Sequence, residues 1–311
     1  MSFSKDLFIE IFNSIDFVKI KDHPNILIAA SFWEEDRYNA ARICYKFMRA
    51  IDDLIDNHKA LNTVITNEER IRFAVDINNW IDELLLPGDG DSLKKELTET
   101  INRYRIPRWP LEAFANSMVY DINNDGFSTL DSFIDYSQGA SVAPASIFVH
   151  LNSLTKKNGF YESPPFDVRE TATPCAIFSY LVHIIRDFQK DQLNNLNYFA
   201  DDMLAKYKLT RFDLKEIAWG HPVSDNFRNL ISDYCEIAEE HRIRCCETIK
   251  RITPLLEPRY QLSLEIIFNL YLMVFEKIDI KNGNFSAEEL NPTPAETKNR
   301  VFKIISDFRP D

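Results

Sequence analysis

The sequence predicts an all-α protein, and three observations on its 311 residues lead to that fold class. Apolar residues recur at spacings of three and four along most of the chain, which is the period of an amphipathic helix. The 7 glycines and 14 prolines fall between segments that lack the alternating pattern of a β-strand. A glycine-rich phosphate loop, which would indicate a nucleotide-binding α/β fold, is absent from the sequence.

The helix boundaries follow from the residues that interrupt this pattern. The first helix is expected to end near His23 and Pro24, because proline disfavours helical backbone in the residue before it. The sequences PGDGD, IPRWP and NNDG mark three later breaks. The predicted helices cover residues 3–20, 34–57, 68–86, 93–104, 111–122, 130–154 (as two helices around Gly139), 168–192, 201–207, 212–218, 225–252, 258–280 and 295–308, with a loop over 156–165.

The composition fits one domain with a large apolar interior. Apolar residues make up 45% of the chain, and no internal repeat, low-complexity tract or flexible linker interrupts it. We therefore expect a single domain over residues 1–311. The first twenty residues carry acidic side chains within their apolar pattern, which is not typical of a signal peptide, and no run of about 18 apolar residues is present for a membrane span.

Charge and cysteine content narrow the function classes. A net charge of −12 argues against nucleic acid as a partner. The net charge is still compatible with a small anionic substrate, provided that metal ions or a local group of Arg and Lys make the electrostatic potential in the site positive. The five cysteines show no CxxC spacing, and thus indicate reduced thiols in a cytoplasmic protein. They are Cys44, Cys175, Cys235, Cys245 and Cys246.

The stretch CYKFMRAIDDLIDNHKA, residues 44–60, places like charges on one turn of a half-apolar helix. Asp52 and Asp56 are separated by four residues, so both carboxylates project from the same helix face. Two carboxylates at that distance raise each other's pKa unless a cation lies between them. Mg²⁺ is the usual cation for such a pair when a phosphate is the substrate.

A second cluster with the same spacing occurs in HIIRDFQKDQLNNLNYF. Asp187 and Asp191 are again four residues apart, and Arg186 precedes them as Arg49 precedes the first pair. A single acidic pair on a helix is usually a solvated face. Two pairs within apolar stretches, each beside an arginine, instead favour a metal–diphosphate site, in which the arginines take phosphate oxygens.

These motifs resemble those of the squalene/phytoene synthase family. The chain as a whole looks like a divergent member of that family. YKFMRAIDDLID is similar to the first aspartate-rich motif of the family, and RDFQKD followed by NYF is similar to the second. DYSQGASVA and MVYDINNDGF resemble the family segments that lie between them, and YFADDMLAKYKLTRFDL and NLYLMVFEKIDIKNGNF resemble later ones. The resemblance covers about residues 25–308, and the two acidic motifs are its most specific part.

The resemblance implies a single-domain isoprenoid synthase fold with a central apolar cavity and two or three Mg²⁺ ions at its mouth. The implied metal residues are Asp52, Asp53 (as a supporting acid), Asp56, Asp187 and Asp191. The implied catalytic and diphosphate-binding residues are Tyr45, Tyr136, Arg49, Arg186 and Tyr198. Taken without the motifs, the tyrosines could equally be core residues with a satisfied hydroxyl, and Arg49 could simply pair with Asp53.

Five positions depart from the family pattern. Tyr180 stands where the family usually has Gln, His183 where it has Asn, and Leu196 where it has Arg. Pro24 and Asn25 replace a basic or serine-containing segment. His183 precedes Asp187 by four residues and could donate to that carboxylate or bind metal. Because imidazole is poorly suited to Mg²⁺, we expect it to support the site without binding the ion.

The resemblance implies Mg²⁺-dependent head-to-head (1′-1) condensation of two prenyl diphosphates, farnesyl or geranylgeranyl, to a squalene- or phytoene-type product. One alternative is a single-substrate terpene cyclase or prenyl diphosphate hydrolase on the same fold, since the changed positions affect the second diphosphate. Another is a non-catalytic family member. We expect a cytoplasmic protein whose contact with membranes is at most peripheral. Through such contact the protein could take up a hydrophobic substrate from the lipid. The sequence predicts no particular oligomeric state.

Overall fold

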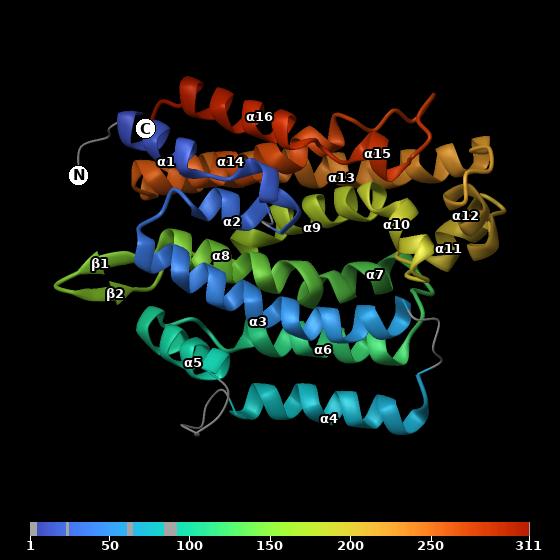
Figure 1. Cartoon of the computed structure of the whole chain (residues 1–311), viewed down its shortest axis with the longest axis horizontal. Helices are drawn as coiled ribbons and strands as arrows, with labels where there is room; N and C mark the ends of the chain where they lie inside the picture. Colours follow the sequence, from blue (N-terminus) through green and yellow to red (C-terminus); the bar gives the residue numbers. More distant parts are fainter. Residues whose placement is uncertain (1–4, 23–24, 61–64, 84–91, 311) are drawn as a thin grey trace.

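The structure, a computed structural model, describes residues 5–22, 25–60, 65–83 and 92–310 (Figure 1). Helices dominate these residues, and the longer ones run roughly side by side, which confirms the predicted all-α class. The helices are α1 (Lys5–Ser14), α2 (Asn25–Ala30), α3 (Glu35–Ala60), α4 (Asn67–Glu83), α5 (Ser92–Tyr104), α6 (Trp109–Asn123), α7 (Leu130–Ser137), α8 (Ala143–Ser153), α9 (Val168–Arg186), α10 (Phe188–Leu193), α11 (Asp201–Lys206), α12 (Arg211–Ala218), α13 (Asp225–Ile252), α14 (Pro258–Phe275), α15 (Ala287–Leu290) and α16 (Pro294–Asp307).

Two predicted helices are each divided in the structure. The segment predicted over 3–20 holds α1 and then a separate 3₁₀ helix, Phe17–Asp22, while its first two residues lie outside the described ones. The division occurs because the Asp16 carboxylate accepts the backbone N–H of Val18 (3.1 Å) and begins a new turn. The segment predicted over 168–192 divides into α9 and α10 at Asp187, whose φ of −92° and ψ of 3° are not those of a helix.

The loop predicted over 156–165 is partly wrong, because it contains most of a short antiparallel hairpin. Strand β1 (Thr155–Lys157) pairs with β2 (Phe160–Glu162), and the two are joined by Asn158 (φ 52°) and Gly159 (φ 85°). Two central residues with positive φ are typical of the tight turn that a two-residue hairpin needs. Three-residue strands carry too little alternation to be recognised in sequence. The short helices α2 and α15 were also not predicted, and the helix predicted over 258–280 ends earlier, at Phe275.

Gly139 marks a π-helical segment between α7 and α8. Residues Gln138–Val142 form this wider turn, so the two predicted helices are joined without a loop. A Cβ at Gly139 would lie 2.1 Å from the Ala113 carbonyl oxygen and from Ser117 Oγ, both on α6. Glycine therefore allows α6 to approach closely, and Ser117 donates to the Tyr136 carbonyl (2.9 Å). Such π segments are often found at functional sites, because they change the direction of the side chains around them.

The packing of the long helices encloses a space at the centre of the molecule. Helix α9 packs along α13 and against α8, while α3 contacts α6 and α8, and α14 contacts α2 and α16. Figure 1 shows α4 and α16 on opposite outer sides of this arrangement. Among the described residues, no helix is long and apolar enough to span a bilayer.

Aromatic packing fixes α10, which carries part of the second acidic motif. Phe188 of α10 lies 4.8 Å from Phe227 and 5.9 Å from Phe199, measured between ring centroids, and all three rings are buried. Buried phenylalanines dominate the energetics of a core, because each removes a large apolar surface from water. The short helix α10 is therefore anchored to the core through Phe188, although it is only six residues long.

Candidate active site

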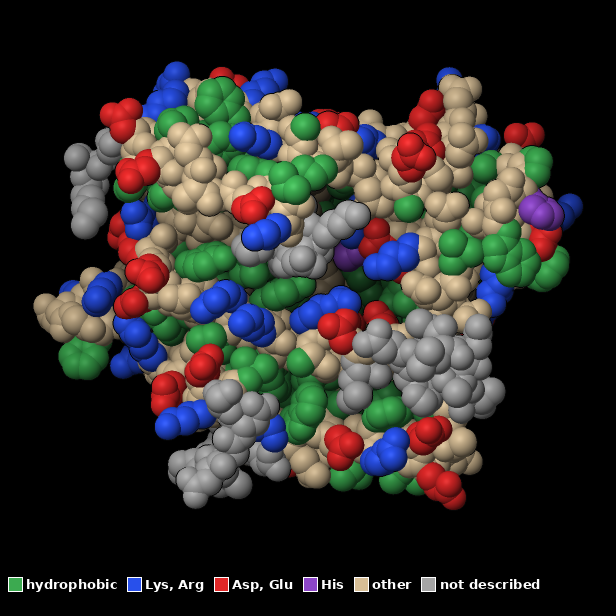
Figure 2. Space-filling model, viewed as in Figure 1, with side chains coloured by type: hydrophobic (Ala, Val, Ile, Leu, Met, Phe, Trp, Pro, Cys, Tyr) green, Lys and Arg blue, Asp and Glu red, His purple; other side chains and the backbone are tan. Residues whose placement is uncertain are grey.

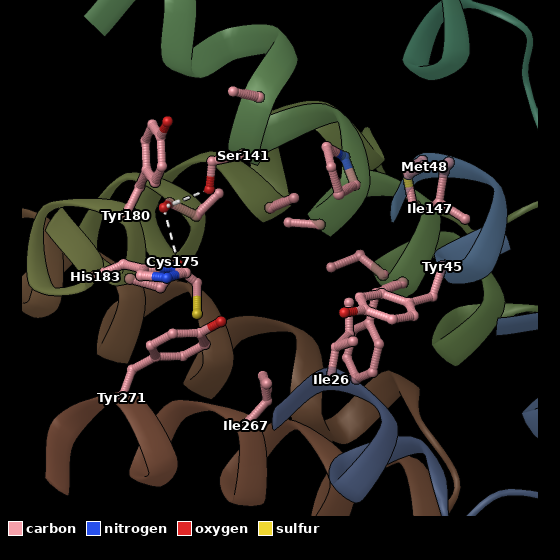
Figure 3. A pocket seen from close by; sticks show the side chains of 18 of the residues that line it. Ile26, Tyr45, Met48, Ser141, Ile147, Cys175, Tyr180, His183, Ile267 and Tyr271 are labelled. Atoms are coloured by element: carbon pink, nitrogen blue, oxygen red, sulfur yellow. Dashed lines mark hydrogen bonds between the residues drawn. The ribbon is translucent and has the colours of Figure 1, made fainter. Parts of the chain in front are cut away.

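A cavity of about 380 Å³ lies among α2, α3, α6–α9, α13 and α14. Its walls are mostly apolar and include Ile26, Met48, Ile147 and Ile267. Figure 3 shows Tyr45 and Met48 on one side and Tyr180, His183 and Tyr271 on the other. Figure 2 shows a hollow near the centre of the face in view, with charged side chains of both signs around it. An apolar pocket with a few convergent polar groups is the usual form of a small-molecule site.

The two acidic pairs meet at this cavity. Asp52 and Asp56 reach it from α3, and Asp187 and Asp191 from the end of α9 and from α10. Burial and the neighbouring Asp56 raise the pKa of Asp52 to about 7. Burial raises the pKa of Asp191 to about 8, with contributions from Asp187 and, across the cavity, from Asp56. The two motifs, far apart in sequence, therefore act on each other electrostatically.

Asp187 differs from the other three acids in the number of cationic partners that the chain supplies to it. Arg186 donates to both of its oxygens, from Nε to Oδ1 (2.7 Å) and from Nη2 to Oδ2 (2.8 Å), and His183 Nε2 lies 2.7 Å from Oδ2. Although burial alone would raise it, these partners hold the pKa of Asp187 well below its usual range. Burial and the Arg186 charge lower the pKa of His183. The sequence-based expectation that His183 donates to Asp187 agrees with this geometry.

The predicted diphosphate and supporting residues are placed unequally. Tyr45 and Arg49 line the cavity, and Arg49 Nη1 donates to Asp52 Oδ2 (2.8 Å) while Nη2 pairs with Asp53. Asp53 and Arg186 are not among the lining residues. The pairing of Arg49 with Asp53 on its own helix is therefore present, and Arg186 is engaged by Asp187 in the same structure. The roles predicted for Asp53 and Arg186 remain predictions.

Three tyrosines form an aromatic wall beside the acids. The ring centroids of Tyr136 and Tyr180 are 6.4 Å apart, and those of Tyr180 and Tyr198 are 6.2 Å apart. Phe133 stacks on Tyr180 from the core side at 5.3 Å. Burial raises the pKa of all three phenols well above the usual value, so they remain neutral. These tyrosines line the cavity while packing like core residues, and their rings are placed to stabilise a positive charge.

The donor chemistry of the acidic residues fits Mg²⁺. Asp52, Asp56 and Asp191 are carboxylates whose ionised forms are destabilised by burial and by one another, and a divalent cation relieves both effects. Mg²⁺ prefers such oxygen ligands together with substrate phosphate. Over the described residues, no three His, Cys, Asp or Glu side chains are already arranged to hold an ion, so the fit rests on donor type and charge.

The cavity lining and the residues directly behind it contain functional candidates that were not predicted from the sequence. Asp121 of α6 accepts a hydrogen bond from the Tyr136 hydroxyl (2.5 Å), and Lys190 and Tyr271 line the cavity. Each lies in a segment with a family resemblance: MVYDINNDGF, RDFQKD and NLYLMVFEKIDIKNGNF, respectively. The resemblance of these segments to the family could therefore have pointed to them. Only the folded structure shows which of their side chains lie at the cavity. Leu196 lies away from this cavity, at a small neighbouring cleft, and Pro24 lies outside the described residues.

A model of the squalene/phytoene synthase family matches residues 21–296. The chain belongs to the squalene/phytoene synthase family. It is accordingly a prenyltransferase of that type, a class that acts on prenyl diphosphates. A comparison with curated proteins gave no match.

Solved structures support the family's fold over nearly the whole chain. A dehydrosqualene synthase in complex with ligand has a TM-score of 0.67 at 15% identity, and 98% of each chain is covered. The squalene synthase HpnC from Alicyclobacillus acidocaldarius has a TM-score of 0.65 at 13% identity, covering 88% of this chain and 95% of its own. YisP from Bacillus subtilis has a TM-score of 0.58 at 15% identity, covering 99% and 100%. The predicted isoprenoid synthase fold with a central apolar cavity is thereby confirmed.

Proposed function

We propose that this protein condenses two prenyl diphosphates, farnesyl or geranylgeranyl, head to head in a Mg²⁺-dependent reaction that gives a squalene- or phytoene-type product. The observation that carries the proposal is that both acidic pairs line one apolar cavity. Such a cavity can hold a prenyl chain between its apolar walls and a diphosphate next to its acidic residues. Neither the acidic pairs alone nor the apolar cavity alone would favour this chemistry over ordinary ligand binding.

The chain supplies the groups that bind and orient the diphosphate. Asp52, Asp56 and Asp191 would hold the Mg²⁺ ions, with Asp187 as a fourth acid if Arg186 yields part of its contact. When bound, Mg²⁺ withdraws charge from the diphosphate and so favours cleavage of its carbon–oxygen bond. Arg49 and Lys190, both in the cavity lining, would take phosphate oxygens directly.

The chain also controls the allylic cation that this cleavage leaves. Tyr136, Tyr180 and Tyr198 present aromatic rings to the cavity, and a π face stabilises a cation within about 6 Å. The apolar walls exclude water, which would otherwise capture the cation as an alcohol. In the condensation, the double bond of a second prenyl diphosphate attacks first and a cyclopropylcarbinyl diphosphate forms.

One observation favours the single-substrate alternative, in which one prenyl diphosphate is cyclised or hydrolysed. Arg186 directs Nε and Nη2 to Asp187, and Leu196 brings no charge to a position where the family usually has Arg. The cations left to bind a second diphosphate are therefore fewer than the family pattern implies. The non-catalytic alternative receives no comparable support, because the four acids share the cavity.

The distinguishing experiment is an incubation of the purified protein with Mg²⁺ and farnesyl or geranylgeranyl diphosphate, with products identified by mass. A C30 or C40 product agrees with condensation, and a product that keeps the C15 or C20 skeleton contradicts it. Chelation with EDTA and the Asp52→Asn variant serve as controls and are expected to abolish turnover. A non-catalytic protein would give no product under any of these conditions.

A further inference from the structure

Helix α3 carries a row of three cations beside the opening of the cavity. Arg42, Lys46 and Arg49 follow one another at spacings of four and three residues, so their side chains lie on one stripe of the helix. Figure 2 shows Lys and Arg side chains gathered over α3 next to the hollow in this face. Tyr45 and Arg49 line the cavity itself, whereas Arg42 and Lys46 are exposed. The row therefore leads from solvent to the site that holds the acids.

The two outer cations of this row are placed differently from Arg49. Among the residues that the structure describes, neither Arg42 nor Lys46 forms an ion pair or a side-chain hydrogen bond. Between Asp36 and Asp52, α3 contains no acidic residue that could neutralise them, whereas Arg49 contacts two aspartates. In a chain with a net charge of −12, two exposed cations that the described acids leave unpaired indicate an anionic ligand.

These two cations lie close to a segment from which the family pattern leads us to expect positive charge. The family usually has a basic or serine-containing segment where this chain begins α2 with Asn25. Helix α2 packs against α3, and Figure 3 shows Ile26 and Tyr45 on the same side of the cavity. Arg42, one turn before Tyr45, and Lys46, directly after it, lie next to this part of the wall. Helix α3 thus supplies positive charge beside a segment that brings none.

A head-to-head condensation needs cations for two diphosphates. Arg49, Lys190 and the Mg²⁺ ions are assigned to one of them, and Arg186 directs two of its nitrogens to Asp187. Arg42 lies two helical turns before Arg49, a rise of about 10 Å along α3. That separation lets a second diphosphate lie beside the first without sharing its ligands.

We propose that Arg42 and Lys46 form an anion-binding site at the rim of the cavity that takes the diphosphate of the second prenyl diphosphate, an inference that rests on the proposed function. The Arg42 guanidinium can contact two phosphate oxygens at once, and the Lys46 ammonium adds a point charge. Neither residue is among those that the family resemblance implies for the site. The prenyl chain of this substrate enters the cavity past Tyr45, and its diphosphate stays at the opening.

The test is the binding of a non-reactive thio-diphosphate analogue of farnesyl diphosphate to the full-length protein with Mg²⁺, measured by titration calorimetry. The wild type is expected to bind two molecules per chain. In the Arg42→Gln/Lys46→Gln variant, the weaker of the two sites should lose affinity by about 10-fold, while the tighter site changes little. Because salt screens exposed charges, added KCl should weaken the second site of the wild type more than that of the variant.

A matched control removes two exposed lysines that lie away from the cavity lining. Lys250 of α13 and Lys303 of α16 are both exposed. The Lys250→Gln/Lys303→Gln variant makes the same change in net charge and should keep both affinities. The Arg42→Lys/Lys46→Arg variant keeps both charges at the rim and should retain most of the second-site affinity. Melting temperatures verify that each variant is folded.

Sedimentation with phosphatidylglycerol vesicles tests the other source of phosphate, a lipid headgroup. If the Arg42→Gln/Lys46→Gln variant loses vesicle binding but keeps the wild-type affinity for the analogue, the two cations serve lipid and the inference is overturned. It is also overturned if the control variant loses affinity equally, or if the wild type binds one analogue per chain.

The proposed condensation is judged separately, from the mass of the product. A C30 or C40 product together with unchanged analogue binding in the Arg42→Gln/Lys46→Gln variant removes the rim site and leaves the condensation standing. A C15 or C20 product together with a weakened second site in that variant removes the condensation and leaves the rim site standing.

Discussion

The two acidic motifs are alike in sequence and different in structure. Each has an arginine beside two aspartates that are four residues apart. The first lies inside the unbroken helix α3, where Arg49 is shared between Asp52 and Asp53 and is half-exposed. The second straddles the break between α9 and α10, where Arg186 is largely buried and both of its contacts go to Asp187.

This structural difference gives the four acids different pKa values. Burial and like charge raise the pKa of Asp52 and Asp191, whereas Arg186 and His183 lower that of Asp187 despite its burial. Asp187 has thus received two basic partners from the chain, whereas Asp52 shares one arginine with Asp53 and keeps a raised pKa, as Asp191 does. Equal spacing in a sequence does not imply equal demand for metal, because the demand depends on which partners the fold supplies.

The largest effect expected from this comparison is on catalysis. Asp52→Asn and Asp191→Asn should each reduce the rate of diphosphate release by about 100-fold or more, because each removes charge that would hold Mg²⁺ against the leaving group. Asp53→Asn is the matched control, since Asp53 is adjacent in sequence but not in the cavity lining. An equal loss in Asp53→Asn would show that the first motif binds metal with a different set of acids.

The next effect is on stability, and it contrasts the two arginines. Arg186→Met leaves Asp187 buried with an incomplete set of partners and should lower the free energy of unfolding by about 3 kcal/mol. Arg49→Met removes a pair that is 47% exposed on the arginine side, and should cost less than about 1 kcal/mol. Urea denaturation of both variants measures the difference, and similar costs would contradict the contrast drawn between the motifs.

A third effect is a dependence of stability on pH in the absence of divalent ions. The folded pKa values of Asp52 and Asp191, about 7 and about 8, lie above those of an unfolded chain, so the folded state binds more protons between about pH 4 and pH 8. Stability should therefore fall as pH rises through that range. Asp187 contributes with the opposite sign, because its lowered pKa gives stability that is lost only in acid.

Melting temperatures in EDTA, measured at steps between pH 5 and pH 8, check this sign. Added Mg²⁺ should restore the melting temperature most at pH 8, where the acids are ionised and compete least with protons. The Asp52→Asn variant should show a shallower fall, since it lacks one of the titrating groups. A melting temperature that rises steadily with pH in EDTA would exclude this account of the acids.

The smallest effect concerns the choice of metal. His183→Asn replaces an imidazole on Asp187 with an amide, whose oxygen is better suited to Mg²⁺. We expect the affinity for Mg²⁺ relative to Mn²⁺ to rise several-fold, as measured by titration calorimetry. An unchanged ratio would place His183 outside the influence of the ion.

Much of the fold was predictable because helices are local. The spacing of apolar residues predicted α3, α5, α6 and α13 to within three residues at each end. The failures occurred where a side chain redirected the backbone, as at Asp16 and Asp187, or where an element was too short to show a period, as in the β1–β2 hairpin. Such interactions depend on one or two residues and leave little trace in a pattern averaged over a helix.

The sequence by itself determined the helical class, the two acidic motifs and the family to which they belong, because spacing along one helix and short motifs are properties of neighbouring residues. Only the tertiary structure decided that Arg186 and His183 both contact Asp187, and that Asp121 accepts a hydrogen bond from Tyr136 behind the cavity wall. The reason is physical: charge state and burial depend on residues that are far apart in the chain, and those residues become neighbours only when α3, α6, α7, α9 and α10 pack together.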